Sequence, residues 1–171
     1  MYRMVSDQEF PTNIQRNCVV RGHHFEALDQ NVQHLICSAQ KALATAYAPY
    51  SNFFVGAALW MENGKIILGS NQENAAYPSG LCAERTAIFA SGVQEPGVRV
   101  LAMAVVVARS DGAELGPAFP CGSCLQVLLE VERRQNTPVK VYLKGTSEHV
   151  YEAEGVSVFL PFGFDPSAFQ V

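Results

Sequence analysis

Two short stretches of the chain bring thiols and a carboxylate together at spacings that suit metal chemistry. Residues 120–124 read Pro-Cys-Gly-Ser-Cys, which places the thiols of Cys121 and Cys124 three residues apart. Positions i and i+3 share one face of a helix, so both sulfur atoms can bind the same ion. A third thiol, Cys82, lies two residues before Glu84. We therefore regard the three cysteines as candidate ligands of one zinc ion, with Glu84 beside them.

The Cys-x-x-Cys pair alone leaves several interpretations open. It is also typical of a dithiol redox pair, of half a structural zinc site, or of two small core residues. A closed structural site needs a fourth ligand. The remaining candidates are two cysteines and four histidines: Cys18, Cys37, His23, His24, His34 and His149. None of them has ligand spacing with another candidate, and three protein ligands would leave the fourth position open for water, as in catalytic zinc sites.

Glu84 and Arg85 follow Cys82 closely enough to serve such a centre. A carboxylate within hydrogen-bond reach of zinc-bound water can take its proton and deliver it elsewhere. The alternative for Glu84 is an ordinary first-turn acid that complements the helix dipole. Three thiolates would leave the metal rich in negative charge, and a guanidinium that donates to the sulfurs would withdraw some of it. We expect this role for Arg85, rather than that of a surface arginine.

The spacing of apolar residues predicts the elements that position these groups. Three- and four-residue steps from Asp29 to Ala46 predict an amphipathic helix. The segments 53–61 and 65–70 predict a hairpin in which Asn63-Gly64 supplies positive φ. Further helices are expected over about 82–91 and 121–133, the latter with Pro120 at its first position. Strands are expected over 98–108, 139–143 and 149–153, with a short edge strand in 18–25. The alternation predicts an α/β fold, a three-layer α/β/α sandwich with one mixed sheet of about five strands.

Length and charge narrow the class of protein. The chain has 171 residues, with 49% apolar and 16% charged residues, so we expect one catalytic domain over 29–171 and a partly ordered N-terminal extension over 1–28. The net charge is −4 and Lys and Arg form no run, which argues against nucleic-acid and membrane partners and favours a small molecule. No stretch has the length of a signal peptide's apolar core or of a membrane span, so we expect a cytoplasmic protein.

Four segments together resemble the zinc-dependent cytidine deaminase family. They are YSNFFVGAAL (50–59), GSNQENAAYPSGLCAERTAIF (69–89), PCGSCLQVLLE (120–130) and LPFGF (160–164). The resemblance covers about residues 29–164 and points to the small, homotetrameric, free-nucleoside type, with sites at subunit interfaces. It implies hydrolytic deamination of cytidine and 2′-deoxycytidine to uridine and 2′-deoxyuridine, a reaction of pyrimidine salvage. A cytosine nucleoside analogue such as blasticidin S is the alternative substrate.

The resemblance implies a role for each matched residue. Cys82, Cys121 and Cys124 would hold one zinc ion per chain, Glu84 would be the catalytic proton carrier, Arg85 would support the ligands, and Phe53, Asn71, Glu73, Ala83 and Phe164 would bind the substrate. Within that last set, Asn71 and Glu73 would bind the ribose hydroxyls, and the backbone near Ala83 would contact the base. Phe53 would lie against the nucleoside, and Phe164 would stack on the pyrimidine of a neighbouring subunit.

Residue patterns alone would give several of these positions a different interpretation. Asn71 and Glu73 would be turn residues, and Phe53 and Phe164 core aromatics. The chain also departs from the family pattern, because Leu125 stands where many relatives carry arginine after the second cysteine of the pair. Arg85 is then the evident cation beside the thiolates.

Overall fold

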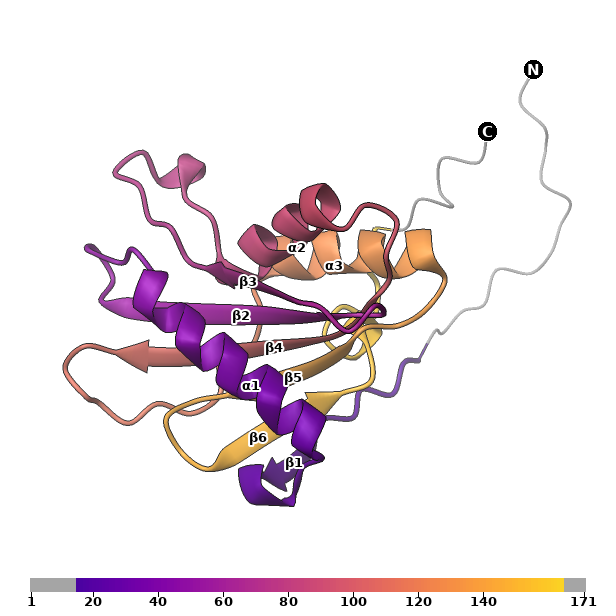
Figure 1. Ribbon diagram of the computed structural model, residues 1–171, viewed down its shortest axis with the longest axis horizontal. Helices are drawn as coiled ribbons and strands as arrows, with labels where there is room; N and C mark the ends of the chain where they lie inside the picture. Colours follow the sequence, from indigo (N-terminus) through magenta and orange to yellow (C-terminus); the bar gives the residue numbers. More distant parts are fainter. Residues whose placement is uncertain (1–14, 165–171) are drawn as a thin grey trace, which may run out of the picture.

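The sheet lies between two helical layers in the computed structural model, which describes residues 15–164 (Figure 1). Within these residues six strands have the order β1-β6-β5-β4-β2-β3, and the β4–β5 pair is parallel while the other pairs are antiparallel. The strands are β1 (Arg21–His24), β2 (Phe53–Met61), β3 (Ile66–Ser70), β4 (Val100–Arg109), β5 (Lys140–Lys144) and β6 (His149–Ala153). The predicted three-layer α/β/α class is confirmed, with six strands in place of about five.

The additional strand comes from the predicted N-terminal extension. β1 pairs antiparallel with β6, from Arg21 opposite Glu152 to His24 opposite His149, and forms one edge of the sheet. This confirms the short edge strand expected within 18–25. Residues 1–14 of the predicted extension lie outside the described residues.

Helices cover both faces of the sheet (Figure 1). α1 (Gln30–Ala42) lies on one face, while α2 (Ala83–Gln94) and α3 (Gly122–Gln135) lie on the other. Asp29 caps α1, since its carboxylate accepts a hydrogen bond of 2.8 Å from the amide of Asn31. The described residues also include four short 3₁₀ turns: η1 (Phe25–Ala27), η2 (Leu43–Thr45), η3 (Tyr77–Ser79) and η4 (Val156–Val158).

The interior strands β2 and β4 are buried on both sides. In β2, Ala57 and Leu59 face the core under α2 and α3, whereas Ala58 between them faces α1. β4 alternates in the same way along its nearly continuous apolar run. Covered central strands of this kind need apolar residues at every position, which explains why period-two alternation is absent from the sequence.

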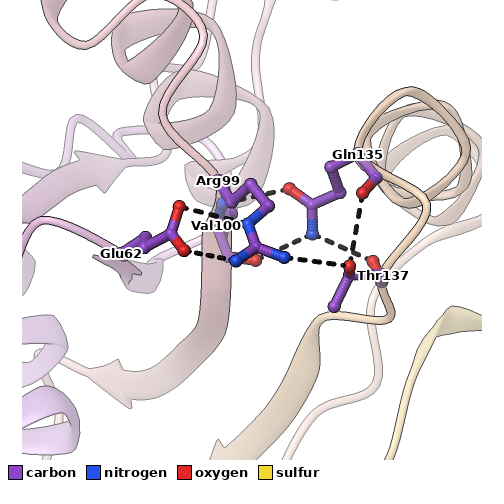
Figure 2. A network of polar contacts seen from close by, with 5 residues as sticks. All are labelled: Glu62, Arg99, Val100, Gln135 and Thr137. Carbon is purple, nitrogen blue, oxygen red and sulfur yellow. Dashed lines mark hydrogen bonds and ion pairs between the residues drawn. The ribbon is translucent and has the colours of Figure 1, made fainter.

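A polar network joins the start of β4 to the β2–β3 turn and to the end of α3 (Figure 2). Arg99, just before β4, forms an ion pair with Glu62 in the β2–β3 turn and donates to the hydroxyl of Thr137. The carboxamide of Gln135, the last residue of α3, accepts from the amide of Val100 at 3.0 Å and donates to its carbonyl at 2.9 Å. The end of α3 is thereby joined to the first residue of β4.

α2 lies unusually close to β3, and Gly69 makes this possible. A Cβ atom at Gly69 would be 2.4 Å from both the carbonyl oxygen of Ala83 and the amide nitrogen of Ala87. Both contacts are backbone atoms of α2, which cannot rotate away as a side chain can. The helix that begins beside Cys82 therefore depends on a residue without a side chain in the neighbouring strand.

We predict that Gly69→Ala lowers the free energy of unfolding by about 3 kcal/mol, because α2 must move off the sheet to admit the methyl group. Urea unfolding followed by circular dichroism measures the change. Gly92→Ala is the matched control, since Gly92 lies in α2 with open space around its Cβ direction, and we expect about 0.5–1 kcal/mol of stabilisation from helix propensity. Equal stabilities for the two variants would contradict the close approach.

Candidate active site

The starts of α2 and α3 meet at one edge of the sheet. β3 and β4 are both antiparallel to β2, so they run in the same direction, and each is followed in the chain by one of these helices. Both helices therefore begin near the carboxyl ends of these strands, which is where α/β proteins commonly bind ligands. The residues that begin the two helices are Cys82 and Cys121.

Cys82 and Cys121 are both helix N-caps. Each has extended backbone angles, and each carbonyl accepts the first helical hydrogen bond, of 3.0 Å, from Thr86 and Leu125 respectively. The prediction that Pro120 occupies the first helical position is wrong: helical bonding starts at Cys121, so Pro120 lies one residue before the cap. Each thiol therefore lies beside the orphan N–H groups and the positive dipole end of a helix.

The three sulfur atoms fit one zinc ion. The Sγ atoms of Cys82, Cys121 and Cys124 all lie within 4.8 Å of one another. The Cys82–Cys121 separation is 3.9 Å and the Cys121–Cys124 separation is 3.4 Å. Tetrahedral zinc with bonds of about 2.3 Å needs sulfur atoms about 3.8 Å apart. No fourth His, Cys, Asp or Glu among residues 15–164 joins this group, so the described chain offers three ligands and an open position.

Charge on the thiols is distributed unevenly. Hydrogen bonds from the Cys124 thiol and from Arg85 lower the pKa of Cys82 to about 5. The same hydrogen bond to Cys82, together with burial, raises the pKa of Cys124. Arg85 Nη2 lies 3.7 Å from the Cys82 sulfur, and its buried Nε has no hydrogen-bond partner among the described residues. The guanidinium thus lies within contact of the Cys82 sulfur, on which the expected role of Arg85 depends.

Leu125 contributes no charge to this arrangement. Its side chain is buried in the core between the sheet and the helices α2 and α3. Since an apolar residue occupies the position after Cys124, Arg85 is the cation that contacts the ligand sulfurs in the described structure. The leucine that replaces the family's arginine at position 125 is therefore a core residue in this structure.

A cavity of about 730 Å³ opens beside the thiols. Seven of the predicted site residues line it: Phe53, Asn71, Glu73, Cys82, Glu84, Arg85 and Cys121. Ala83 and Cys124 are buried next to the cavity lining without being part of it. Phe164 is also outside the lining and is 57% exposed, so its ring does not reach the cavity of its own chain.

Glu84 is a buried acid on the wall of this cavity. Its residue is 5% exposed, at the second position of α2. Burial raises the pKa of its carboxyl, and the negative charge of the neighbouring Cys82 thiolate raises it further. A carboxyl with a raised pKa binds a proton more readily than an exposed glutamate does, which suits a group that carries protons.

Asn71 and Glu73 hold the segment 50–55 on the opposite wall. The Asn71 carboxamide accepts from the amide of Val55 at 2.8 Å and donates to the carbonyl of Phe53 at 2.8 Å. The Glu73 carboxylate accepts from the Ser51 hydroxyl and from the amide of Tyr50 at 2.9 Å. The Ser51 hydrogen bond is the main cause of a lowered pKa for Glu73, which therefore stays ionised. Both polar groups are fixed in orientation beside the cavity.

The structure adds lining residues to which sequence reasoning gave no role. Tyr50 and Tyr77 lie at one side, with ring centroids 6.2 Å apart, and Val107 of β4 forms part of the floor. Phe119 lines another side and is supported by ring contacts with Tyr151 at 5.9 Å and with Phe159. Its place immediately before Pro120-Cys121 was the one signal in the sequence that could have indicated it.

Comparison with known proteins shows the family. Residues 29–138 match the family described as the cytidine and deoxycytidylate deaminase zinc-binding region. The chain belongs to this family. It is 42% identical to the cytidine deaminase of Sporosarcina psychrophila over 134 residues, which are 78% of this chain and 91% of the relative. It is also 42% identical to the cytidine deaminase of Halalkalibacterium halodurans, over 77% of this chain and 92% of the relative.

Solved structures of the deaminase family agree with the fold. The crystal structure of cytidine deaminase from Burkholderia pseudomallei superposes with a TM-score of 0.67 at 38% identity, over 80% of this chain and all of that one. Cytidine deaminase from Mycobacterium tuberculosis gives 0.61 at 33% identity, over 80% of this chain and 99% of that one. Membership in a zinc-binding family, together with the sulfur spacing, identifies zinc as the cofactor of this deaminase.

We predict about one zinc ion per chain, and its loss to well below half occupancy in Cys124→Ser, because two thiols and a hydroxyl make a poor zinc site. Zinc is measured by atomic emission after gel filtration in buffer containing a weak chelator. Cys37→Ser is the control, since Cys37 lies on α1 across the sheet and we expect unchanged zinc content. An equal loss in both variants would show that the three-cysteine cluster is not the zinc site.

Proposed function

We propose that this deaminase converts cytidine and 2′-deoxycytidine to uridine and 2′-deoxyuridine, with water as the second substrate and ammonia as the second product. The observation that carries the proposal is the buried carboxyl of Glu84 in the same cavity as the Cys82 and Cys121 thiols. Relatives that cover most of the chain and bear the name cytidine deaminase support it. The cavity, at about 730 Å³, is also in the size range of small-molecule sites.

Zinc, when bound, supplies an acidic water by lowering its pKa from about 15.7 to roughly 7. Glu84 then handles the protons. Its carboxylate would accept a proton from the attacking water and place it on N3 of the pyrimidine as the water oxygen bonds to C4. It would then take the proton of the new C4 hydroxyl and deliver it to the amino group as the C4–N bond breaks, which releases ammonia and leaves the carbonyl at C4. Burial and the neighbouring Cys82 raise the pKa of this carboxyl above its ordinary value, which makes it a stronger base for the first transfer than an exposed glutamate would be. Arg85 supports this chemistry by drawing negative charge from Cys82.

Asn71 and Glu73 bind the sugar in this proposal. A carboxylate accepts hydrogen bonds from hydroxyls strongly, and an amide both donates and accepts. Each group already makes hydrogen bonds to segment 50–55. Both keep lone pairs that can accept a hydrogen bond from a ligand, and the Asn71 amide also keeps a second N–H hydrogen that can donate one. Because these contacts fix their orientation, the side chains are arranged before substrate arrives, which lowers the entropic cost of binding.

Two phenylalanines and a second subunit complete the proposed pocket. Phe53 lines the cavity and lies against the nucleoside, while the backbone near Ala83 contacts the base. Phe164 is exposed and outside its own cavity, so we assign it to the pyrimidine of a neighbouring subunit in a homotetramer. Exposed Phe89 and Val93 on α2 give that assembly an apolar surface.

The proposal extends to the choice of substrate and to the location of the enzyme in the cell. Glu73 and Asn71 are suited to ribose hydroxyls, so ordinary nucleosides are preferred to an analogue such as blasticidin S. Among residues 15–164, no helix is long and apolar enough to cross a membrane. We place the enzyme in the cytoplasm, because five free cysteines, three of them zinc ligands, need a reducing compartment.

We predict that Glu84→Gln lowers kcat for cytidine by about 1,000-fold or more, since general acid–base catalysis contributes 10²–10⁴ and the amide cannot carry the proton. The decrease of cytidine absorbance on deamination measures the rate, and zinc content is measured on the same sample. Glu130→Gln, an exposed position on α3, is the control and should retain wild-type activity. Wild-type protein that holds zinc but does not turn over cytidine would reject the proposed function.

We predict that Glu73→Gln lowers kcat/KM for cytidine about tenfold or more, because a charge-assisted hydrogen bond to a sugar hydroxyl is lost. The same substitution should change kcat/KM for 2′,3′-dideoxycytidine much less, since that substrate lacks the hydroxyls. Comparing the two ratios separates sugar binding from the support that Glu73 gives to Tyr50 and Ser51. Equal losses with both substrates would limit Glu73 to the supporting role.

A further inference from the structure

The side chain of Gln126 makes hydrogen bonds to both backbone polar groups of Phe164, its amide and its carbonyl. The carboxamide nitrogen of Gln126 donates to the carbonyl of Phe164 at 2.7 Å, and its oxygen accepts from the amide of Phe164 at 3.1 Å. A carboxamide carries a donor and an acceptor side by side, so it can replace a neighbouring strand for a single residue. The backbone of Phe164 is therefore fixed while its ring is 57% exposed.

Close packing brings the C-terminal segment to this position. A Cβ atom at Gly163 would be 2.5 Å from Cδ2 of Leu129 on α3 and 2.7 Å from Cδ2 of Leu160. A glycine there lets the backbone lie directly against α3, where Gln126 can reach the next residue. The segment LPFGF, which marked the resemblance in the sequence, thus has a local structural reason for its glycine.

A glutamine at the other end of α3 makes an equivalent pair of backbone hydrogen bonds, but to a core residue. Gln135 binds the amide and carbonyl of Val100 as Gln126 binds those of Phe164. Val100 is 4% exposed at the start of a central strand, so that contact serves the core. Gln126 instead lies two residues after the zinc ligand Cys124, and it holds a residue whose ring faces away from the core.

We infer that Gln126 is a positioning residue for the deaminase reaction, acting through the aromatic ring of Phe164. The inference rests on the proposed function, in which that ring stacks on the pyrimidine in a neighbouring subunit. In this arrangement α3 supplies two zinc ligands to the site of its own subunit. Through Gln126 it also positions the Phe164 ring that completes the site of the neighbouring subunit. Loss of the carboxamide leaves the ring present but frees its backbone.

A double-substitution experiment on the zinc-loaded enzyme tests this role. Gln126→Met keeps the length of the side chain and removes both hydrogen bonds, and Phe164→Ala removes the ring. We expect each to raise KM for cytidine about tenfold, the range that loss of one base–aromatic stack produces, with kcat within about twofold of wild type. We expect the double variant to match Phe164→Ala alone, because without a ring its position no longer matters.

Gln135→Met is the matched control, because it tests whether loss of such a hydrogen-bond pair on α3 affects KM through stability alone. It removes the equivalent pair of hydrogen bonds at the other end of α3, so we expect lower stability to urea with KM unchanged. Hydrogen exchange of the C-terminal peptide, which reports the freed backbone without activity, should accelerate in Gln126→Met and not in Gln135→Met. If Gln126→Met binds less zinc, Gln126→Asn takes its place, because its shorter amide cannot span to Phe164.

The outcomes separate this inference from the proposed function. An unchanged KM in Gln126→Met, or an equal further rise in KM when it is added to Phe164→Ala, would overturn the positioning role. Wild-type enzyme that holds zinc and shows no cytidine turnover would instead reject the function itself, whatever the exchange data show.

Discussion

Binding one zinc ion with Cys82, Cys121 and Cys124 would bring three thiolates together, and the structure of this chain offsets their mutual repulsion at one point. Two helix N-termini meet there, and their unpaired N–H groups and dipoles offset part of the negative charge. The meeting requires β3 and β4 to run in the same direction, so that α2 and α3 start at one edge of the sheet. It also requires α2 to lie against β3 closely enough that Gly69 has no room for a methyl group. Sheet direction and a single glycine thus decide whether Cys82 reaches Cys121.

The sequence predicted those parts of the molecule that depend on local patterns. Periodicity placed the hairpin, the central strand and all three helices, with shifts of one to three residues at most of their ends, and β6 has the predicted bounds. The prediction for Pro120 placed it at the first helical position, two residues further into α3 than the structure does, because the local sequence also fits a proline just before the N-cap. The three thiols could be grouped from their spacing, since Cys-x-x-Cys at a helix start leaves few arrangements.

Contacts between residues that are far apart in the sequence could not be predicted. Phe119 lines the cavity only because rings from β6 and from the end of η4 support it, and neither is near it in sequence. Gln126 and Gln135 look like ordinary polar residues of an amphipathic helix, yet each binds both backbone groups of a distant residue. α3 therefore carries two cysteines of the candidate zinc site and contacts both the first residue of β4 and the C-terminal segment at Phe164.

Glu73 and Glu84 line the same cavity in opposite electrostatic settings, and this difference is consistent with the separate roles proposed for them. Glu73 accepts hydrogen bonds from Ser51 and Tyr50, which lower its pKa and keep it charged, so it suits a fixed hydrogen-bond acceptor for a sugar. Glu84 is buried beside Cys82, which raises its pKa and makes proton exchange easy. Exchanging these environments would leave a binding group that loses its charge and a proton carrier that stays ionised. The distinct surroundings of two chemically identical side chains therefore fit the two roles proposed for them, sugar binding for Glu73 and proton transfer for Glu84.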